Sequence, residues 1–400
     1  MLGTAASRAA LGTIIGVAFC GGGTSAFAQE WKLESNISQR VLYSDNLLLS
    51  RDREIETVGF ITTPALHLER NSPTSQIAFD GRFEFAEYID HSDFNSQDQL
   101  LNLQVDQALS ERAAFRLGAG FTHDTTLKSE QDVTGRFLDD SIEFITWNVG
   151  PGFAYRLTPV DEMVVRGNYR ETTYYDTDEK TDYKFFGPAM DFRHQLNELE
   201  AVTATIGATR FIPDEPGKDY TDTISTLFSY SYQSSERFSI SGGLGVAYSM
   251  QHEDPGQDSD DVGFRLKFDM NYDVSDQTSV RASLSHDNEP SGDGDTVVRN
   301  RVVLGLNHKL TPLTTARLNV DYTDNVDIIG SEGDETSDEN TSRYTSVRPA
   351  IAWQLTEDWS LETSYRFRYR LFDDGGGDAM SNSVFLTLQY NFPTWAGTGF

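Results

Sequence analysis

The feature that most constrains this chain is a two-residue alternation of apolar and polar side chains that recurs along most of its length. The stretch TSYRFRYRL (363–371) alternates aromatic rings with three arginines, and FRLKFDMNYD (264–273) and SVFLTLQYNF (383–392) repeat the pattern. Successive side chains of an extended strand point to opposite faces. Helical 3.6-residue periodicity is not evident in any long segment. The sequence therefore predicts an all-β chain.

The first 28 residues predict export. One basic residue, Arg8, precedes the apolar run AALGTIIGVAFC, and the small residues of TSAFA follow it. This order is typical of a signal peptide, so we expect residues 1–28 to be removed and residues 29–400 to form the mature chain. The only cysteine, Cys20, lies in this segment, and Phe19 before it is too large for a lipidation site. Disulfides and cysteine metal sites are not expected in the mature chain.

Charge and hydropathy narrow the class of protein further. The chain has 62 acidic and 32 basic side chains and a net charge of -30, which disfavours a nucleic-acid partner. No later segment approaches the roughly 18 apolar residues of a membrane helix. An exported chain of this kind is either a soluble β protein or a closed β-barrel of an outer membrane.

Short polar turn phrases return at intervals of roughly 40 residues, as expected for a hairpin repeat. Ser, Thr, Asn, Asp and Pro suit tight turns. Longer acidic loops separate successive phrases, and short turns at one end with long loops at the other are typical of outer-membrane barrels. The phrases are RNSPTS (70–75), ALSERA (108–113), RLTPVDE (156–162), QLNELE (195–200), QSSERF (233–238), DVSDQT (273–278), KLTPLT (309–314) and QLTEDW (354–359).

These turns predict a transmembrane antiparallel up-and-down β-barrel of about 18 strands, with short periplasmic turns and long acidic extracellular loops. The first strand is expected near residues 31–43 and the last at about 382–392, followed by a short tail at 393–400. A β-propeller repeats at a similar length, but each blade has four short strands, whereas each repeat here has room for two long ones.

In a wide barrel one strand face meets lipid and the other meets a water-filled lumen. An arginine at the lipid midplane costs roughly 2–4 kcal/mol, so the arginine face is predicted to point inward. Two interpretations of the lumenal basic residues remain open: a ladder that guides an anionic solute or glycan, or ion pairs that brace the wall with Asp269, Asp273 and Asp321. The lumen-facing basic candidates are Arg265, Lys267, Arg281, Arg317, Arg366, Arg368 and Arg370. The lipid-facing aromatic candidates are Phe264, Phe268, Tyr365, Phe367, Tyr369, Tyr390 and Phe392.

The acidic loops do not predict a metal site. SGDGD (291–295) and DPGQDSDD (254–261) are rich in carboxylates, but they lack the spacing of an EF-hand loop, so solvated surface is expected. The stretch HDTTLKSEQDVTGRFLDD (123–140) is the longest candidate for a loop that folds into the lumen.

The sequence has no clear motif for catalysis or for binding a cofactor. The seven histidines are scattered, no H-E-x-x-H or G-x-S-x-G motif occurs, and GGLGVAYS (242–249) lies in a predicted strand rather than before a helix. His91 and His252 lie beside acidic residues at strand tips, as in the omptin-like proteases, but those barrels have fewer strands. No enzymatic activity and no cofactor are expected.

The stretch QRVLYSDNLLLS (39–50) resembles the aromatic-x-Asp-Asn phrase that opens the outer-membrane β-barrel porin group found with exopolysaccharide systems. Tyr43, Asp45 and Asn46 match this phrase, and the L-T-P and L-T-E turns fit the same group. The resemblance implies a barrel of about 18 strands that moves polysaccharide across the outer membrane. It carries over no catalytic residue.

The expected function is therefore a pore in the outer membrane of a Gram-negative bacterium, for polysaccharide export or passive diffusion of polar solutes. A structural or adhesive surface protein with a plugged lumen is the alternative. Expected partners are outer-membrane lipid, lipopolysaccharide, polysaccharide and periplasmic export components. The segment SVFLTLQYNF resembles the closing strand that the barrel assembly machinery reads, ending on Phe392.

Overall fold

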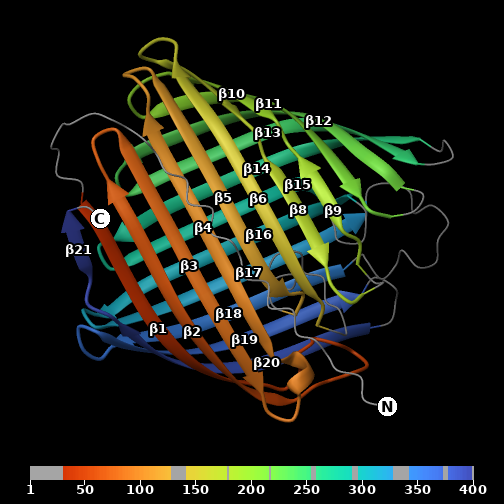
Figure 1. Cartoon of the computed structure of the whole chain (residues 1–400), viewed down its shortest axis with the longest axis vertical. Helices are drawn as coiled ribbons and strands as arrows, with labels where there is room; N and C mark the ends of the chain where they lie inside the picture. Colours follow the sequence, from red (N-terminus) through yellow and green to blue (C-terminus); the bar gives the residue numbers. More distant parts are fainter. Residues whose placement is uncertain are drawn as a thin grey trace, which may run out of the picture.

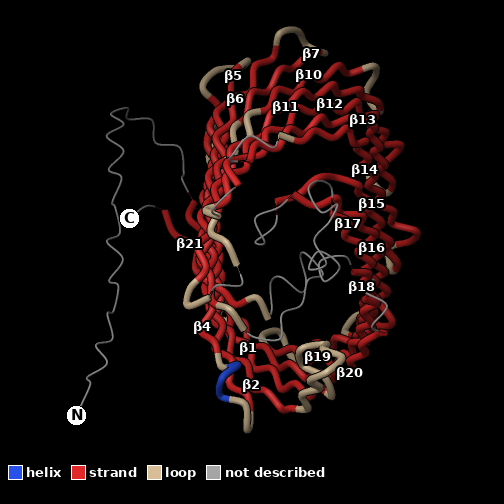
Figure 2. The backbone as a smooth tube through the Cα atoms, turned by 90° about the vertical axis from the view of Figure 1, so that its right-hand side faces the viewer, coloured by secondary structure: helices blue, strands red, loops and turns tan. Residues whose placement is uncertain are grey.

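The computed structural model places one continuous antiparallel sheet around a closed ring (Figure 1). The described residues are 30–127, 141–177, 180–215, 218–253, 258–290, 296–327, 342–372 and 377–398. The ring closes because β1 (Glu30–Ser44) pairs with β2 (Thr57–Asn71) on one edge and with β20 (Gly377–Asn391) on the other. Figure 2 shows β1 and β2 beside β19 and β20, where the first and last parts of the chain meet.

The sheet has 21 strands, which make 18 crossings of the barrel wall. The early strands are β3 (Ser75–Tyr88), β4 (Ser96–Ala108), β5 (Ala113–Thr125), β6 (Glu143–Arg156), β7 (Asp161–Arg166), β8 (Tyr169–Tyr174), β9 (Tyr183–Phe186), β10 (Ala189–Gln195) and β11 (Glu200–Pro213). The later strands are β12 (Lys218–Ser235), β13 (Phe238–Glu253), β14 (Ser259–Ser275), β15 (Thr278–Pro290), β16 (Thr296–Thr311), β17 (Thr314–Asp327), β18 (Ser342–Gln354), β19 (Trp359–Phe372) and β21 (Trp395–Thr398). The predicted antiparallel barrel of about 18 strands is confirmed.

Two crossings are each divided into two short strands. β7 and β8 are separated by Gly167 and Asn168, and β9 and β10 by Gly187 and Pro188. Proline lacks the N–H that a ladder needs, so a break at this point is expected. Asn168 and Gly187 still exchange backbone hydrogen bonds of 3.0 and 2.7 Å, so neighbouring crossings stay paired through the break.

The eight tight turns share one hydrogen-bonding device, which explains the returning turn phrases. A short polar side chain near the start of each turn accepts a backbone N–H donated two or three residues later, as Asx and ST turns do. At Thr158, for example, the hydroxyl accepts from the N–H groups of Val160 and Asp161. The eight accepting residues are Ser72, Ser110, Thr158, Asn197, Ser235, Ser275, Thr311 and Thr356.

The end of the chain differs from the sequence prediction. The last long strand, β20, begins at Gly377, five positions before the expected 382. The expected tail contains β21, which pairs with the start of β1 and places Trp395 opposite Leu33. Pro393 follows Asn391 and Phe392 and cannot donate a ladder hydrogen bond, which accounts for the gap between β20 and β21.

The outward face of the barrel is apolar around much of the ring. Leu244 is 65% exposed, Phe264 is 56% exposed and Phe228 is 69% exposed, although all three lie within long strands. A soluble β protein would bury such side chains, because contiguous exposed apolar surface is rare on soluble monomers. Among the described residues, no helix has the length and apolar character needed to cross a membrane.

A charge on the outward face should destabilise the barrel far more than the same charge on the inward face. Leu244→Arg, near the middle of β13, should lower the free energy of unfolding in lipid by about 2–4 kcal/mol. Urea unfolding in lipid vesicles measures this change. Ser283→Arg on the inward face of β15 is the matched control and should cost much less; equal costs would contradict the assignment of faces.

Candidate functional site

The aromatic residues predicted to face lipid lie on the outward strand face. Phe264 shares the outward face of β14 with Phe268, and Tyr365, Phe367 and Tyr369 share that of β19. At the turn end, the ring of Tyr390 lies 4.8 Å from that of Trp359 and 5.0 Å from that of Phe392. Aromatic groups at the ends of strands match the girdles that border the apolar band of membrane barrels.

The seven basic candidates alternate with those aromatic or apolar residues, so they lie on the inward face of β14, β15, β17 and β19. Their surroundings differ. The Arg265 guanidinium donates to both carboxylate oxygens of Asp287, at 2.8 and 2.6 Å, and Lys267 Nζ lies 3.6 Å from the same carboxylate. Arg317 pairs with Glu362 at 2.8 Å. Arg281 is exposed and has no ion-pair partner among the residues that the structure describes.

Within the described residues, the three aspartates that were expected to form ion pairs with the basic candidates do not do so. Asp321 accepts from Arg301 rather than from a predicted ladder residue, at 2.5 Å. Asp269 lies opposite Ser283, and Asp273 lies opposite Ser279, so neither faces a basic residue across β15. Register between strands decides these pairs, and alternation within one strand does not fix that register.

Arg368 and Arg370 do not face open water, contrary to the expectation for the TSYRFRYRL stretch. Arg368 is 1% exposed and Arg370 is 6% exposed. The Arg368 guanidinium donates to the backbone oxygens of Asn46 and Leu47 at 3.0 and 2.9 Å, and to Ser381 Oγ at 3.0 Å. It therefore holds the segment between β1 and β2 against β19 and β20.

Residues 43–46 have the sequence YSDN, and we call them the YSDN phrase. Its aspartate and asparagine anchor the same segment. Asp45 accepts from the backbone N–H and the side-chain amide of Asn382, at 2.6 and 2.7 Å. Asn46 is buried and donates to the backbone oxygens of Ser50 and Met380. The hydrogen bonds of Asp45 and Asn46 satisfy polar groups that the loop shields from water, so these two residues have a structural role.

Residues 45–56, which we call the mouth loop, fold back over the inward face of the wall. Leu48 and Leu49 are 0% exposed, and Leu49 has a positive φ of 52° that its packing must hold in place. Leu49 contacts Tyr344 and Ala379. The mouth loop also belongs to an apolar cluster, which we call the mouth cluster, with side chains from β1, β2, β3 and β20 and from two other connections. Its members are Leu42, Leu47, Leu48, Ile55, Ile61, Ala86, Tyr88, Phe94, Leu127 and Phe385.

This inward segment was not predicted from the sequence. The apolar run Leu47–Leu49 directly after the YSDN phrase is the signal that could have found it, because a solvated loop would not carry three leucines. Residues 128–140 of the expected inward loop at 123–140 lie outside the described residues. Of its described part, Leu127 is buried in the mouth cluster.

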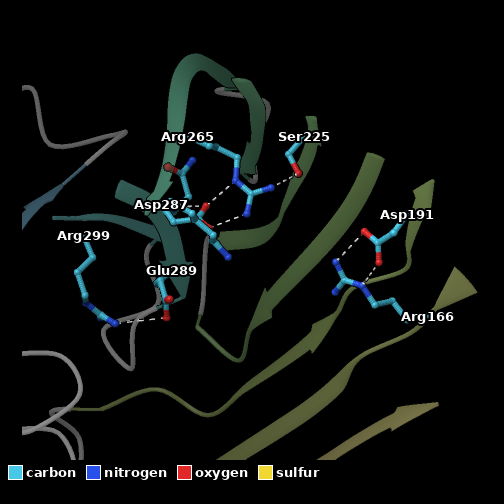
Figure 3. A network of polar contacts seen from close by, with 9 residues as sticks. Arg166, Asp191, Ser225, Arg265, Asp287, Glu289 and Arg299 are labelled. Carbon is cyan, nitrogen blue, oxygen red and sulfur yellow. Dashed lines mark hydrogen bonds and ion pairs between the residues drawn. The ribbon is translucent and has the colours of Figure 1, made fainter. Parts of the chain in front are cut away.

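A polar cavity of about 230 Å³ lies on the inward face of another part of the wall. Figure 3 shows the polar contacts at its edge: Arg265 pairs with Asp287 and donates a hydrogen bond to Ser225, and Arg299 pairs with Glu289 at 3.3 Å. Arg166 and Asp191 form a separate pair farther along the wall. The other lining residues are Asn168, Arg170, Phe185, Thr209, Phe211, Thr221, Thr223, Ala247, Asn288 and Thr296.

The acidic loop SGDGD lies outside the described residues, as does the first half of DPGQDSDD. Within the described part of the chain, no group of three or more His, Cys, Asp or Glu side chains is arranged to hold a metal ion. His252 Nδ1 lies 3.3 Å from Asp258 at a strand tip.

Comparisons with known proteins give a partial family match and similar backbones. Residues 217–342 match the family described as "Protein of unknown function, DUF481". No curated protein matches the sequence.

Three crystal structures have similar backbones at low sequence identity. The outer membrane protein opdK from Pseudomonas aeruginosa is 9% identical, covers 91% of this chain and 99% of its own, and has a TM-score of 0.46. Pseudomonas aeruginosa OpdO is 11% identical, with 90% and 97% coverage and a TM-score of 0.45. Acinetobacter baumannii OccAB3 is 9% identical, with 91% and 99% coverage and a TM-score of 0.46.

Removing the Arg368 side chain should release the mouth loop. Arg368→Ala loses the charged hydrogen bonds that the two N–H groups of Nη2 share among three acceptors, and one such bond contributes about 1.5–3 kcal/mol. Limited trypsin digestion should then cleave faster after the exposed Arg51 and Arg53. Arg281→Ala, which removes an exposed inward arginine without a partner in the described residues, should leave these rates unchanged. Equal cleavage in both variants would show that Arg368 does not hold the loop.

Proposed function

We propose that this chain is an outer-membrane pore for polar solutes. The observation that supports it best is the division of the wall: large apolar side chains face outward and charged side chains face inward around a closed ring. Barrels of 16 to 18 strands leave an aqueous channel, whereas about eight strands leave an interior that side chains fill. Transport in this proposal is by diffusion and uses no enzymatic step.

We further propose polysaccharide as a cargo, with periplasmic export components as partners. The support is the resemblance of the YSDN phrase and its turns to the porin group found with exopolysaccharide systems. In the structure Asp45 and Asn46 of this phrase anchor the mouth loop. Genes for polysaccharide synthesis beside the gene for this chain would support this cargo; their absence would favour a general porin.

A second candidate function is a surface protein whose lumen is closed. The apolar mouth cluster favours it, because buried leucines fill part of the lumen next to β1, β19 and β20. In that case the acidic loops, which bear much of the net charge of -30, would carry the binding function.

Planar-bilayer recording separates the two functions. We expect stable conductance steps from the folded chain, whereas silence would favour the closed surface protein. Arg281→Gln should lower the permeability of anions relative to cations, because it removes an exposed inward charge, and the reversal potential in a salt gradient measures this ratio. Lys184→Gln, on the outward face of β9, is the matched control. A reversal potential that Arg281→Gln leaves unchanged would show that this inward cation does not select ions.

A further inference from the structure

The polar cavity combines aromatic rings, hydroxyl groups and charged groups on one stretch of wall. Arg170 of β8 lies directly opposite Phe185 of β9, and Phe185 lies directly opposite Phe211 of β11. An arginine and two phenyl rings thus lie side by side across three neighbouring strands. Hydroxyl groups continue the lining, from Thr209 of β11 and from Thr221, Thr223 and Ser225 of β12.

The size of the cavity favours a small solute. Its volume of about 230 Å³ is below the roughly 300–1,000 Å³ of sites for drug-sized ligands. Such sites are built from apolar surface with a few converging polar groups. Phe185 and Phe211 provide the apolar surface, and the hydroxyl groups provide donors and acceptors. This combination fits a single ring that has one apolar face and hydroxyl substituents.

The charges around the cavity favour a negative group on that ring. Asp287 is paired by Arg265 at 2.6 Å, and Lys267 lies 3.6 Å away, while Glu289 is paired by Arg299. The residues that line the cavity or pair with its lining residues therefore supply four cations and two carboxylates: Arg170, Arg265, Lys267, Arg299, Asp287 and Glu289.

Arg170 is the member of this set without an ion-pair partner in the described part of the chain. Its side chain lines the cavity and is only partly exposed. A guanidinium can donate two parallel hydrogen bonds to one carboxylate, a geometry that a lysine cannot reproduce. Because Arg265 already uses both its Nε and Nη2 atoms on Asp287, Arg170 is the better placed cation to receive a ligand carboxylate.

We propose that this cavity binds a small hydroxylated ring that carries one carboxylate, such as an acidic monosaccharide. The carboxylate pairs with Arg170, the ring lies against Phe185 and Phe211, and the hydroxyl groups bond to the threonine and serine side chains. A neutral sugar would leave Arg170 unpaired, and a cation would meet an excess of positive charge. The use of this cavity as a step in transport rests on the proposed pore function; the binding itself does not.

Isothermal titration of the detergent-solubilised full chain tests the proposal, with galacturonate, galactose and acetate as probes. We expect galacturonate to bind at least about tenfold more tightly than galactose, because one charged hydrogen-bonded pair contributes about that factor or more. Acetate should also bind more weakly, because it has no ring to contact Phe185. Equal affinity for galacturonate and galactose, or no binding of galacturonate, would overturn the proposal.

Variants locate the binding. Arg170→Gln should weaken galacturonate binding about tenfold while leaving weak galactose binding unchanged, and Arg170→Lys should restore part of the loss. Phe185→Ala should weaken both sugars. Arg82 is an exposed inward arginine of β3, a strand that does not line this cavity. Arg82→Gln is therefore the matched control and should bind galacturonate as the wild type does. Equal affinities in Arg170→Gln and Arg82→Gln would place the binding elsewhere and overturn the proposal.

Bilayer recording on the same preparations separates this proposal from the pore function. Conductance without galacturonate binding would overturn the cavity and leave the pore. Binding without conductance would support the cavity and contradict the pore.

Discussion

Closure of the sheet between β1 and β20 is the constraint on which the other features of the structure depend. An apolar surrounding offers no partner to a backbone N–H or C=O, so every strand needs a neighbour on both sides. Antiparallel pairing continues around the whole ring, including the breaks within the seventh and eighth crossings, where Asn168 and Gly187 still exchange hydrogen bonds. Once the ring is closed, one face of each strand must point outward, and the apolar half of the alternation takes that face.

The closed ring reverses the usual arrangement of a folded domain. Most large apolar side chains lie outside, and close packing inside is concentrated where the mouth loop meets β1, β2, β18, β19 and β20. Burying a charged group is costly unless hydrogen bonds satisfy it. The Nη2 group of Arg368 meets this condition by donating to two backbone oxygens of the mouth loop and to Ser381, whereas its Nε is buried without a hydrogen-bond acceptor among the described residues. The same group gives the Leu47 carbonyl a donor and gives the Asn46 carbonyl, which also accepts from the Leu49 N–H, a second one.

Two parts of the inner wall therefore have different physical character. On β19, Arg368 and Arg370 are buried, and the guanidinium groups of Arg348 and Arg366 lie over the ring of Phe385. From β8 to β16 the wall is polar and open, and its charged groups are joined in the Arg265–Asp287 and Arg299–Glu289 pairs. A solute in the lumen meets the second part as a surface with hydrogen-bonding groups available.

The sequence by itself determined the alternation, the position of every tight turn and the number of crossings, because these depend on a two-residue period and on short polar side chains within a few positions. It also identified the inward face of β14 and β19. Partners across strands needed the tertiary structure: Arg265 reaches Asp287 because the register of β14 and β15 pairs the adjacent residues Leu266 and His286. Asn46 and Arg368 are 322 positions apart, and only closure of the ring brings them into contact, so no local pattern could show that the YSDN phrase holds a loop inside the barrel.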